Sequence, residues 1–89
     1  MEKIFKYPLK IGTNIINMPR FTMPLSIEIQ DDIPVLYAMI RETDNYKEEE
    51  ILVIMTGKEY DLSKYEFLGT AMLHKGSFVL HAFIKVIKD

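Results

Sequence analysis

The sequence predicts an all-β fold: a small antiparallel sandwich or barrel of six to seven strands, with little helix. Short apolar runs are followed by turn signals roughly every eight to twelve residues, the spacing typical of sandwiches and barrels. No stretch has the 3.6-residue apolar periodicity of an amphipathic helix. The length of 89 residues suits one β domain, residues 1–89, because two separate cores would each be too small to be stable.

The first part of the chain predicts two strands and a loop. Residues 4–11 (IFKYPLKI) are typical of a strand, and Pro8 indicates an edge position or a strand end because proline cannot donate to a ladder. Residues 12–14 (GTN) are expected to turn, and residues 15–18 (IINM) to form a short second strand. An ordered loop, MPRFTMP, follows with two prolines.

The middle of the chain predicts a hairpin. Residues 25–30 (LSIEIQ) alternate cleanly, with three side chains expected to face the core: Leu25, Ile27 and Ile29. The two aspartates at 31–32 suit a two-residue turn, since aspartate tolerates left-handed backbone conformations. Residues 34–40 (PVLYAMI) return as the partner strand. The charged stretch at 41–50 (RETDNYKEEE) is expected to be a solvated connection.

The last part predicts a buried strand and a second hairpin. Residues 51–55 (ILVIM) are consecutively apolar, and a single helical turn is expected over 62–64 with Asp61 as its cap. The segments FLGTAML and FVLHAFIKVI are expected to pair across HKGS, whose glycine favours a hairpin loop.

Three of these strands are apolar on both faces, which favours self-association. Antiparallel sheets with one solvated face normally alternate, but residues 34–40, 51–55 and 78–86 do not. A second face left exposed would be an aggregation liability. With no cysteine to form disulfides, we expect a homo-oligomer, a dimer or tetramer, to cover these faces. A short helix or loop of the same chain is the competing cover.

Composition excludes several functional classes. Eleven basic against thirteen acidic residues, a net charge of −2, argue against a partner such as duplex nucleic acid. No apolar run approaches the roughly 18 residues of a membrane span, and the N-terminus lacks the apolar core of a signal peptide. A cytoplasmic location is therefore expected.

Arg20, Phe21 and Tyr7 are candidates for contacts with a nucleotide. Arg20 and Phe21 pair a fork of donors with an aromatic face between two prolines, which suits a phosphate and a stacked base. The same pair equally suits an arginine that packs on a neighbouring loop. Tyr7, beside Lys6 and Pro8, is similarly open to either interpretation.

Three further candidates lie near the end of the chain. His74 and Lys75 occupy the predicted hairpin, where a lysine and backbone amides could meet a phosphate, although an ordinary polar hairpin tip has the same composition. His81 lies between Val79 and Phe83 on one strand face. It is expected to be a buried or interfacial histidine with its ring nitrogens hydrogen-bonded, or a ligand contact at a subunit boundary.

The sequence gives no indication of catalysis. None of the serines lies in a GxSxG-like context, and there is neither a phosphate-binding loop nor a dinucleotide fingerprint. The two histidines have no HxH or HxxxH spacing that would bring them together on one element. We therefore expect no enzyme, no catalytic residues, no metal site and no cofactor.

Several segments together resemble a family of short phage and prophage proteins: KIFKYPL, INMP, IQDDIPVLYA and YEFLGTAML…GSFVLHAF. Their order and spacing cover nearly the whole chain. Asp32 departs from the family's usual hairpin glycine, and the chain continues past Phe83 with IKVIKD.

This resemblance implies a function in the host cytoplasm during infection. The expected function is immune evasion by sequestering a cyclic nucleotide second messenger without cleaving it, in pockets between subunits. Two alternatives remain open: a protein-binding inhibitor of a host or defence enzyme, and a small phage structural or assembly protein.

Overall fold

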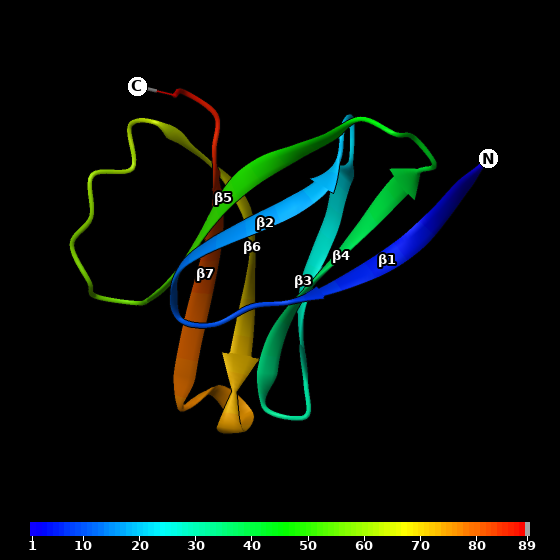
Figure 1. The fold of residues 1–89 in the computed structure, drawn as a ribbon. Coiled ribbons are helices and arrows are strands. Elements are labelled where there is room, and N and C mark those ends of the chain that lie inside the picture. Colours follow the sequence, from blue (N-terminus) through cyan, green and yellow to red (C-terminus); the bar gives the residue numbers. More distant parts are fainter. Residues whose placement is uncertain (89) are drawn as a thin grey trace.

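Two antiparallel sheets stack face to face in the computed structural model, which describes residues 1–88 (Figure 1). The first sheet has the strand order β1-β4-β3, and the second has the order β2-β5-β7-β6. The elements are β1 (Glu2–Pro8), β2 (Gly12–Pro19), β3 (Met23–Gln30), β4 (Ile33–Arg41), β5 (Tyr46–Met55), β6 (Tyr65–Leu73), the 3-10 turn η1 (His74–Gly76) and β7 (Phe78–Lys85). The predicted all-β fold is confirmed as a seven-stranded sandwich, not a closed barrel.

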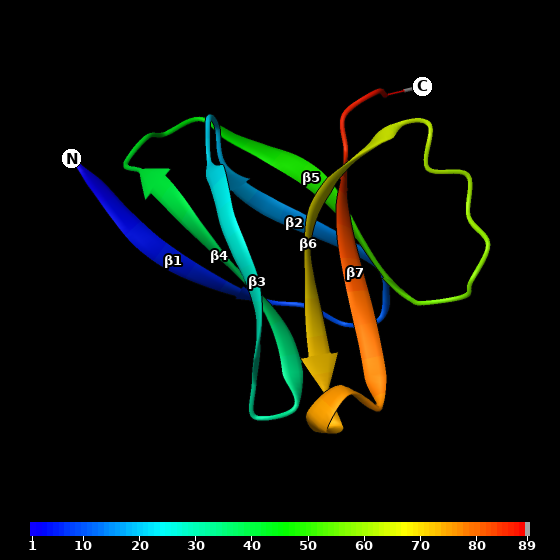
Figure 2. The ribbon, with the colours of Figure 1, turned by 180° about the vertical axis from the view of Figure 1, so that it is seen from behind.

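The chain changes sheet three times before it reaches β5. The connections β1–β2, β2–β3 and β4–β5 cross between the sheets, whereas β3–β4 and β6–β7 are hairpins within one sheet. Residues 56–64 lead from β5 to β6, which flank β7 on opposite sides (Figure 2). The β2–β3 and β4–β5 connections therefore meet at one end of the sandwich, and η1 lies at the other end (Figure 1).

The core lies between the sheets and takes alternate residues from each strand. In β5, Ile51 and Val53 are fully buried, as are Leu80 and Ala82 in β7. The first sheet contributes Ile27, Leu36 and Ala38 to the same cluster. Because successive side chains on a strand point to opposite faces, this inward set fixes the orientation of all other positions.

One side of the sandwich is closed by a close approach of β3 and β6. A β-bulge between Phe67 and Gly69 bends β6, and Gly69 lies directly against Ile27 of β3. A Cβ atom at position 69 would lie 3.2 Å from Ile27 Cγ1 and 3.5 Å from its backbone nitrogen. A side chain at position 69 would therefore crowd Ile27, and the two sheet edges lie side by side (Figure 2).

The hairpin turns follow the predictions, but the first turn does not. Asp31 and Asp32 both adopt positive φ, 52° and 62°, as a two-residue hairpin requires. The turn expected at 12–14 is wrong, because β2 already begins at Gly12. The buried Asn14 side chain accepts the Lys10 N–H at 2.9 Å and donates to the Lys10 carbonyl at 2.9 Å. This side chain closes the turn that precedes β2.

The charged stretch expected as a loop is largely strand. β4 runs to Arg41 and β5 begins at Tyr46, so only residues 42–45 form the connection. Pairing with β2 stabilises the charged start of β5 as a strand, because every residue from Tyr46 to Glu50 faces a β2 residue in the ladder. Local composition alone could not show this long-range pairing.

Two smaller predictions are also wrong. Leu25 is 49% exposed, because a bulge between Pro24 and Ser26 takes it out of the alternation. Residues 62–64 form a turn without helix. Asp61 still accepts the Ser63 N–H at 3.0 Å, and this hydrogen bond lowers the pKa of the Asp61 carboxyl.

The single chain buries part of the second face that was expected to need another subunit. Leu52 and Ile54 point away from the core yet are 4% and 6% exposed, and Val35 of β4 is 3% exposed. On the outer face of the second sheet, the Tyr65 hydroxyl of β6 reaches across β7 and donates to Glu50 Oε2 at 2.5 Å. At these positions the side chains are buried within the single chain, without a second copy.

Replacing Gly69 should open the closed side of the sandwich. We expect Gly69→Val to lower the free energy of unfolding by about 1–3 kcal/mol, because the added atoms overlap Ile27. Urea denaturation measures the effect. Met72→Val, at a 66% exposed position of the same strand, is the control for strand propensity. The double variant Gly69→Val with Ile27→Ala should lose less unfolding free energy than the sum of the losses in the two single variants. Strict additivity would contradict the contact.

Candidate functional site

The structure separates the six predicted site residues into four places. Two lie on the β2–β3 turn at one end of the sandwich and two on η1 at the opposite end (Figure 1). One lies on the outer face of the second sheet and one on the inner face of β1. In that order they are Arg20 and Phe21, His74 and Lys75, His81, and Tyr7. Within one chain, therefore, only the first two pairs are groups of neighbours.

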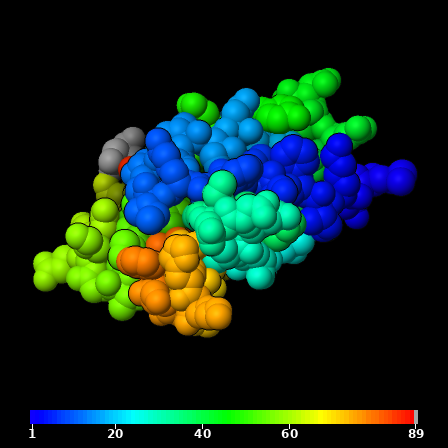
Figure 3. Space-filling model, turned by 90° about the horizontal axis from the view of Figure 1, so that it is seen from below, coloured from blue at the N-terminus to red at the C-terminus, as the bar shows by residue number. Residues whose placement is uncertain are grey.

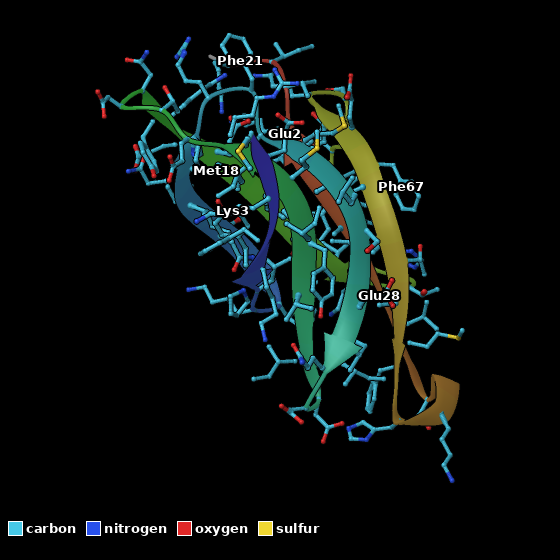
Figure 4. All side chains as sticks on the ribbon, turned by 90° about the vertical axis from the view of Figure 1, so that its right-hand side faces the viewer. Glu2, Lys3, Met18, Phe21, Glu28 and Phe67 are labelled. Atoms are coloured by element: carbon cyan, nitrogen blue, oxygen red, sulfur yellow. The ribbon has the colours of Figure 1, made fainter. Side chains whose placement is uncertain are left out.

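The β2–β3 turn presents Phe21 to solvent. The Thr22 N–H donates to the Pro19 carbonyl at 3.3 Å, and Phe21 has φ 65°, so the turn resembles type II. That position normally takes glycine or asparagine, and a bulky side chain there is unusual. The Phe21 ring is 90% exposed and projects from the end of the molecule (Figure 4). The backbone is thus held in a costly conformation that displays an aromatic ring.

Backbone hydrogen bonds hold this turn in place. The Arg20 N–H donates to the Asn45 carbonyl at 3.0 Å, which ties the turn to the β4–β5 connection. The Thr22 hydroxyl donates to the Pro19 carbonyl at 2.5 Å. The exposed Arg20 and Phe21 side chains therefore extend from a fixed base.

A small cavity of about 240 Å³ lies beside the turn. We call it the turn pocket; it is lined by Pro19, Arg20, Phe21, Thr22, Lys47 and Glu49. Sequence reasoning missed Lys47 and Glu49, because the stretch containing them was expected to be a loop. The alternation of side chains along a strand could have identified them, because positions 47 and 49 lie on the same face as the buried Ile51.

The turn pocket contains a carboxylate oxygen that is not hydrogen-bonded. Glu49 Oε1 is buried and has no hydrogen-bond partner in the described residues. The ammonium groups of Lys47 and Lys88 lie 3.7 Å and 4.0 Å from it, at ion-pair distance. With Arg20, the surroundings combine three cations with one anion, so the local charge is positive.

An acidic depression lies next to this positive pocket. It is lined by Glu42, Thr43 and Asp44 of the β4–β5 connection and by Tyr46 at the start of β5. Carboxylates there would repel a phosphate, whereas Arg20 and Lys47 would attract one. An anionic ligand at this end of the sandwich should therefore lie on the Arg20 side.

His74 and Lys75 form the tip of the β6–β7 hairpin, as predicted. Both have positive φ, 49° and 56°, and both are exposed. The His74 ring packs edge-on against Phe78, with centroids 5.8 Å apart. This tip lies beside the β3–β4 turn (Figure 3). It lies at the end of the sandwich opposite the β2–β3 turn, so a joint site with Arg20 would need two copies of the chain (Figure 1).

His81 bridges two threonines on the outer face of the second sheet. Its Nε2 lies 2.7 Å from Thr56 Oγ1 and its Nδ1 lies 2.9 Å from Thr70 Oγ1. Both ring nitrogens are therefore hydrogen-bonded within the chain, one of the two arrangements expected from the sequence. The contacts link the β5–β6 connection to β7 and β6, so His81 has a structural function in the single chain.

Tyr7 faces inward and packs against the core. Its ring lies 5.0 Å from the Phe5 ring, between centroids, and it is only partly exposed. Burial, and secondarily the neighbouring Tyr46, raise the pKa of its phenol. In this position Tyr7 packs between β1 and the core.

Among residues 1–88, no three His, Asp or Glu side chains are grouped as metal ligands would be. In the same residues, no helix is long and apolar enough to cross a membrane.

The Tyr65–Glu50 hydrogen bond on the outer face should make stability sensitive to alkaline pH. Accepting this proton, the Glu50 carboxylate raises the pKa of Tyr65 to about 12 from an ordinary 10.0. Because the folded state holds the proton more tightly, the stabilisation is complete below pH 10.0 and is lost as the pH rises towards 12. Tyr65→Phe should remove this loss.

Urea denaturation at about pH 8 and about pH 11 measures the difference. Wild type should lose more stability between the two pH values than Tyr65→Phe. Tyr7 is present in both proteins, so its titration affects the stability of both equally and drops out of the comparison. Equal losses would contradict the assignment.

Fold and site together define a two-sheet antiparallel β-sandwich with a small, positively charged pocket at a sheet-crossing turn. Within this class the family is given by sequence: the family model for a domain of unknown function, DUF7352, matches residues 1–88. The chain belongs to that family. No match was found among curated proteins or among solved structures.

Proposed function

We propose that the protein binds an anionic nucleotide at the turn pocket and holds it without chemical change. The observation that carries this proposal is Phe21, a 90% exposed ring kept at positive φ beside Arg20 and a positively charged cavity. Strained residues of this kind concentrate at functional sites. An aromatic face with an adjacent guanidinium is the combination that recognises a base and its phosphate.

The cationic and aromatic lining groups each have a matching partner on a nucleotide. Arg20 and Lys47 would bind phosphate oxygens, with Arg20 donating in a bidentate manner. Phe21 would stack on the base. The buried Glu49 carboxylate would keep Lys47 at the pocket, since its Oε1 lies 3.7 Å from the Lys47 ammonium. A cavity of about 240 Å³ is smaller than the roughly 300–1,000 Å³ of typical small-molecule pockets, so a cyclic dinucleotide would need two such pockets from two chains.

Sequestration is the biological role that accords with binding without conversion. The sequence resembles short phage proteins, and a phage protein that holds a nucleotide second messenger would blunt host immune signalling. Such a function needs affinity and abundance, not a catalytic group. A protein-binding inhibitor of a defence enzyme is the alternative that the experiment below must separate.

Removing Arg20 should weaken binding. We expect Arg20→Ala to cost about 1.5–3 kcal/mol of binding free energy, the contribution of a charge-assisted hydrogen bond. Calorimetry against cyclic dinucleotides, cyclic oligonucleotides and cyclic ADP-ribose-type signals provides the measurement, and chromatography checks that the ligand is recovered intact. If no ligand gives a binding heat and a host enzyme co-purifies with the protein, the inhibitor alternative is supported. A cleaved ligand would identify an enzyme.

Phe21→Gly separates binding from stability. Glycine adopts φ 65° without strain, so the melting temperature should stay the same or rise, while the loss of stacking costs about 1–3 kcal/mol of affinity. Lys75→Ala is the matched control, since it removes one positive charge at the opposite end of the sandwich. It should leave affinity unchanged. If Lys75→Ala weakens binding as much as Arg20→Ala, the site is shared between two copies of the chain.

A further inference from the structure

β1 is an edge strand with an unoccupied side. In the described residues it pairs with β4 alone, whereas the edges of β3 and β6 close against each other. Two of its apolar side chains are exposed, Ile4 at 58% and Phe5 at 44%. An exposed edge of this kind can template pairing with another strand.

The phase of the β1–β4 ladder shows which backbone groups are free. Just beyond β1, the Leu9 N–H donates to the Pro34 carbonyl at 2.8 Å. In an antiparallel ladder, hydrogen-bonded pairs alternate with non-bonded pairs, so the odd-numbered residues of β1 bond to β4. Glu2, Ile4 and Lys6 therefore direct their N–H and C=O groups towards the free side. Pro8 has the same phase, so it lacks an N–H on the side where a pairing strand would end.

One register makes this edge complementary to itself. If two β1 strands pair antiparallel about a two-fold axis at Ile4, the hydrogen-bonded pairs are Ile4 with Ile4, and Glu2 with Lys6 in both directions. Every free N–H and C=O of these three residues is then bonded, and the opposite charges face each other twice. Shifting the pairing to place Glu2 opposite Pro8 loses a donor and puts Ile4 opposite Lys6. A further shift places Lys6 opposite Lys6.

Side chains on both faces agree with this register. On the outer face, Ile4 is in register with Met39 of β4, and Met39 with Met23 of β3, so an apolar row crosses the sheet. Pairing through Ile4 would continue that row through the second copy. On the inner face, Lys3 would lie opposite Phe5 of the second copy, a cation–aromatic contact. Lysines on an edge usually deter pairing, but here none faces another.

We propose that β1 is the dimerisation strand, and that a second copy of this chain adds its own β1 antiparallel at Ile4 to form a continuous six-stranded sheet. Lys6 at present donates to Gln30 Oε1 at 2.7 Å, and Glu2 lies 3.7 Å from the Arg41 guanidinium. Both contacts are on the surface, so Lys6 exchanges a neutral acceptor for a carboxylate. Glu2 also lies 3.8 Å from the Met1 ammonium, so it gains a third cation. This interface differs from the second strand faces expected from the sequence, and it is independent of the turn pocket.

Charge exchange tests the register. Sedimentation equilibrium of the full chain over a concentration series should show a reversible monomer–dimer equilibrium. Lys6→Glu creates two like-charge pairs and should raise the dimer dissociation constant at least about tenfold. Glu2→Lys should do the same. The double variant Glu2→Lys with Lys6→Glu again places opposite charges across the interface. It should therefore recover most of the dimer affinity that each single variant loses.

Ile4→Pro tests the backbone. Its N–H points to the free side, so proline should abolish dimerisation without changing the circular dichroism spectrum or the melting temperature of the monomer at low concentration. A chain that stays monomeric throughout the concentration series overturns the proposal. So does a dimer whose dissociation constant is the same in wild type, Lys6→Glu and Ile4→Pro, because that dimer uses another surface.

Discussion

The contact between Gly69 and Ile27 is the constraint on which the arrangement of the two sheets depends. Because position 69 has no side chain, and because a bulge bends β6 at this point, the edges of β3 and β6 can meet. That meeting closes one side of the sandwich. The opposite side is bordered by the edge strands β1 and β2, which do not pair with each other in the described residues.

The second consequence concerns the end of the sandwich at which the chain changes sheet. The β2–β3 turn and the β4–β5 connection meet there, joined by the hydrogen bond from Arg20 to Asn45. β5 therefore starts directly beneath the turn, and its inward-facing Lys47 and Glu49 line the same cavity as Arg20 and Phe21. A pocket of charged groups arises at the rim of an apolar core because the ladder continues beyond the region that the two sheets fully cover.

A domain this small has few residues with which to cover apolar surface, and the outer faces of the two sheets differ in how they are covered. Polar bridges lie over the outer face of the second sheet, where His81 links Thr56 to Thr70 and Tyr65 reaches Glu50. The first sheet has an exposed apolar row through Ile4 instead. The turn pocket and the β1 edge are separate surfaces, so ligand binding and self-association can coexist on one chain.

The sequence by itself determined the all-β class, the Asp31–Asp32 hairpin and the pairing of the last two strands, because period-two alternation and turn chemistry act over a few residues. It also placed Arg20 and Phe21 in an ordered loop between two prolines. Only the tertiary structure decided that residues 46–50 are strand, that Leu25 is displaced by a bulge, and that Lys47 and Glu49 join the pocket. Likewise, only the fold shows that Arg20 and Lys75 lie at opposite ends. These features depend on which distant strands pair and in which register, and that is decided by contacts between residues far apart in the chain.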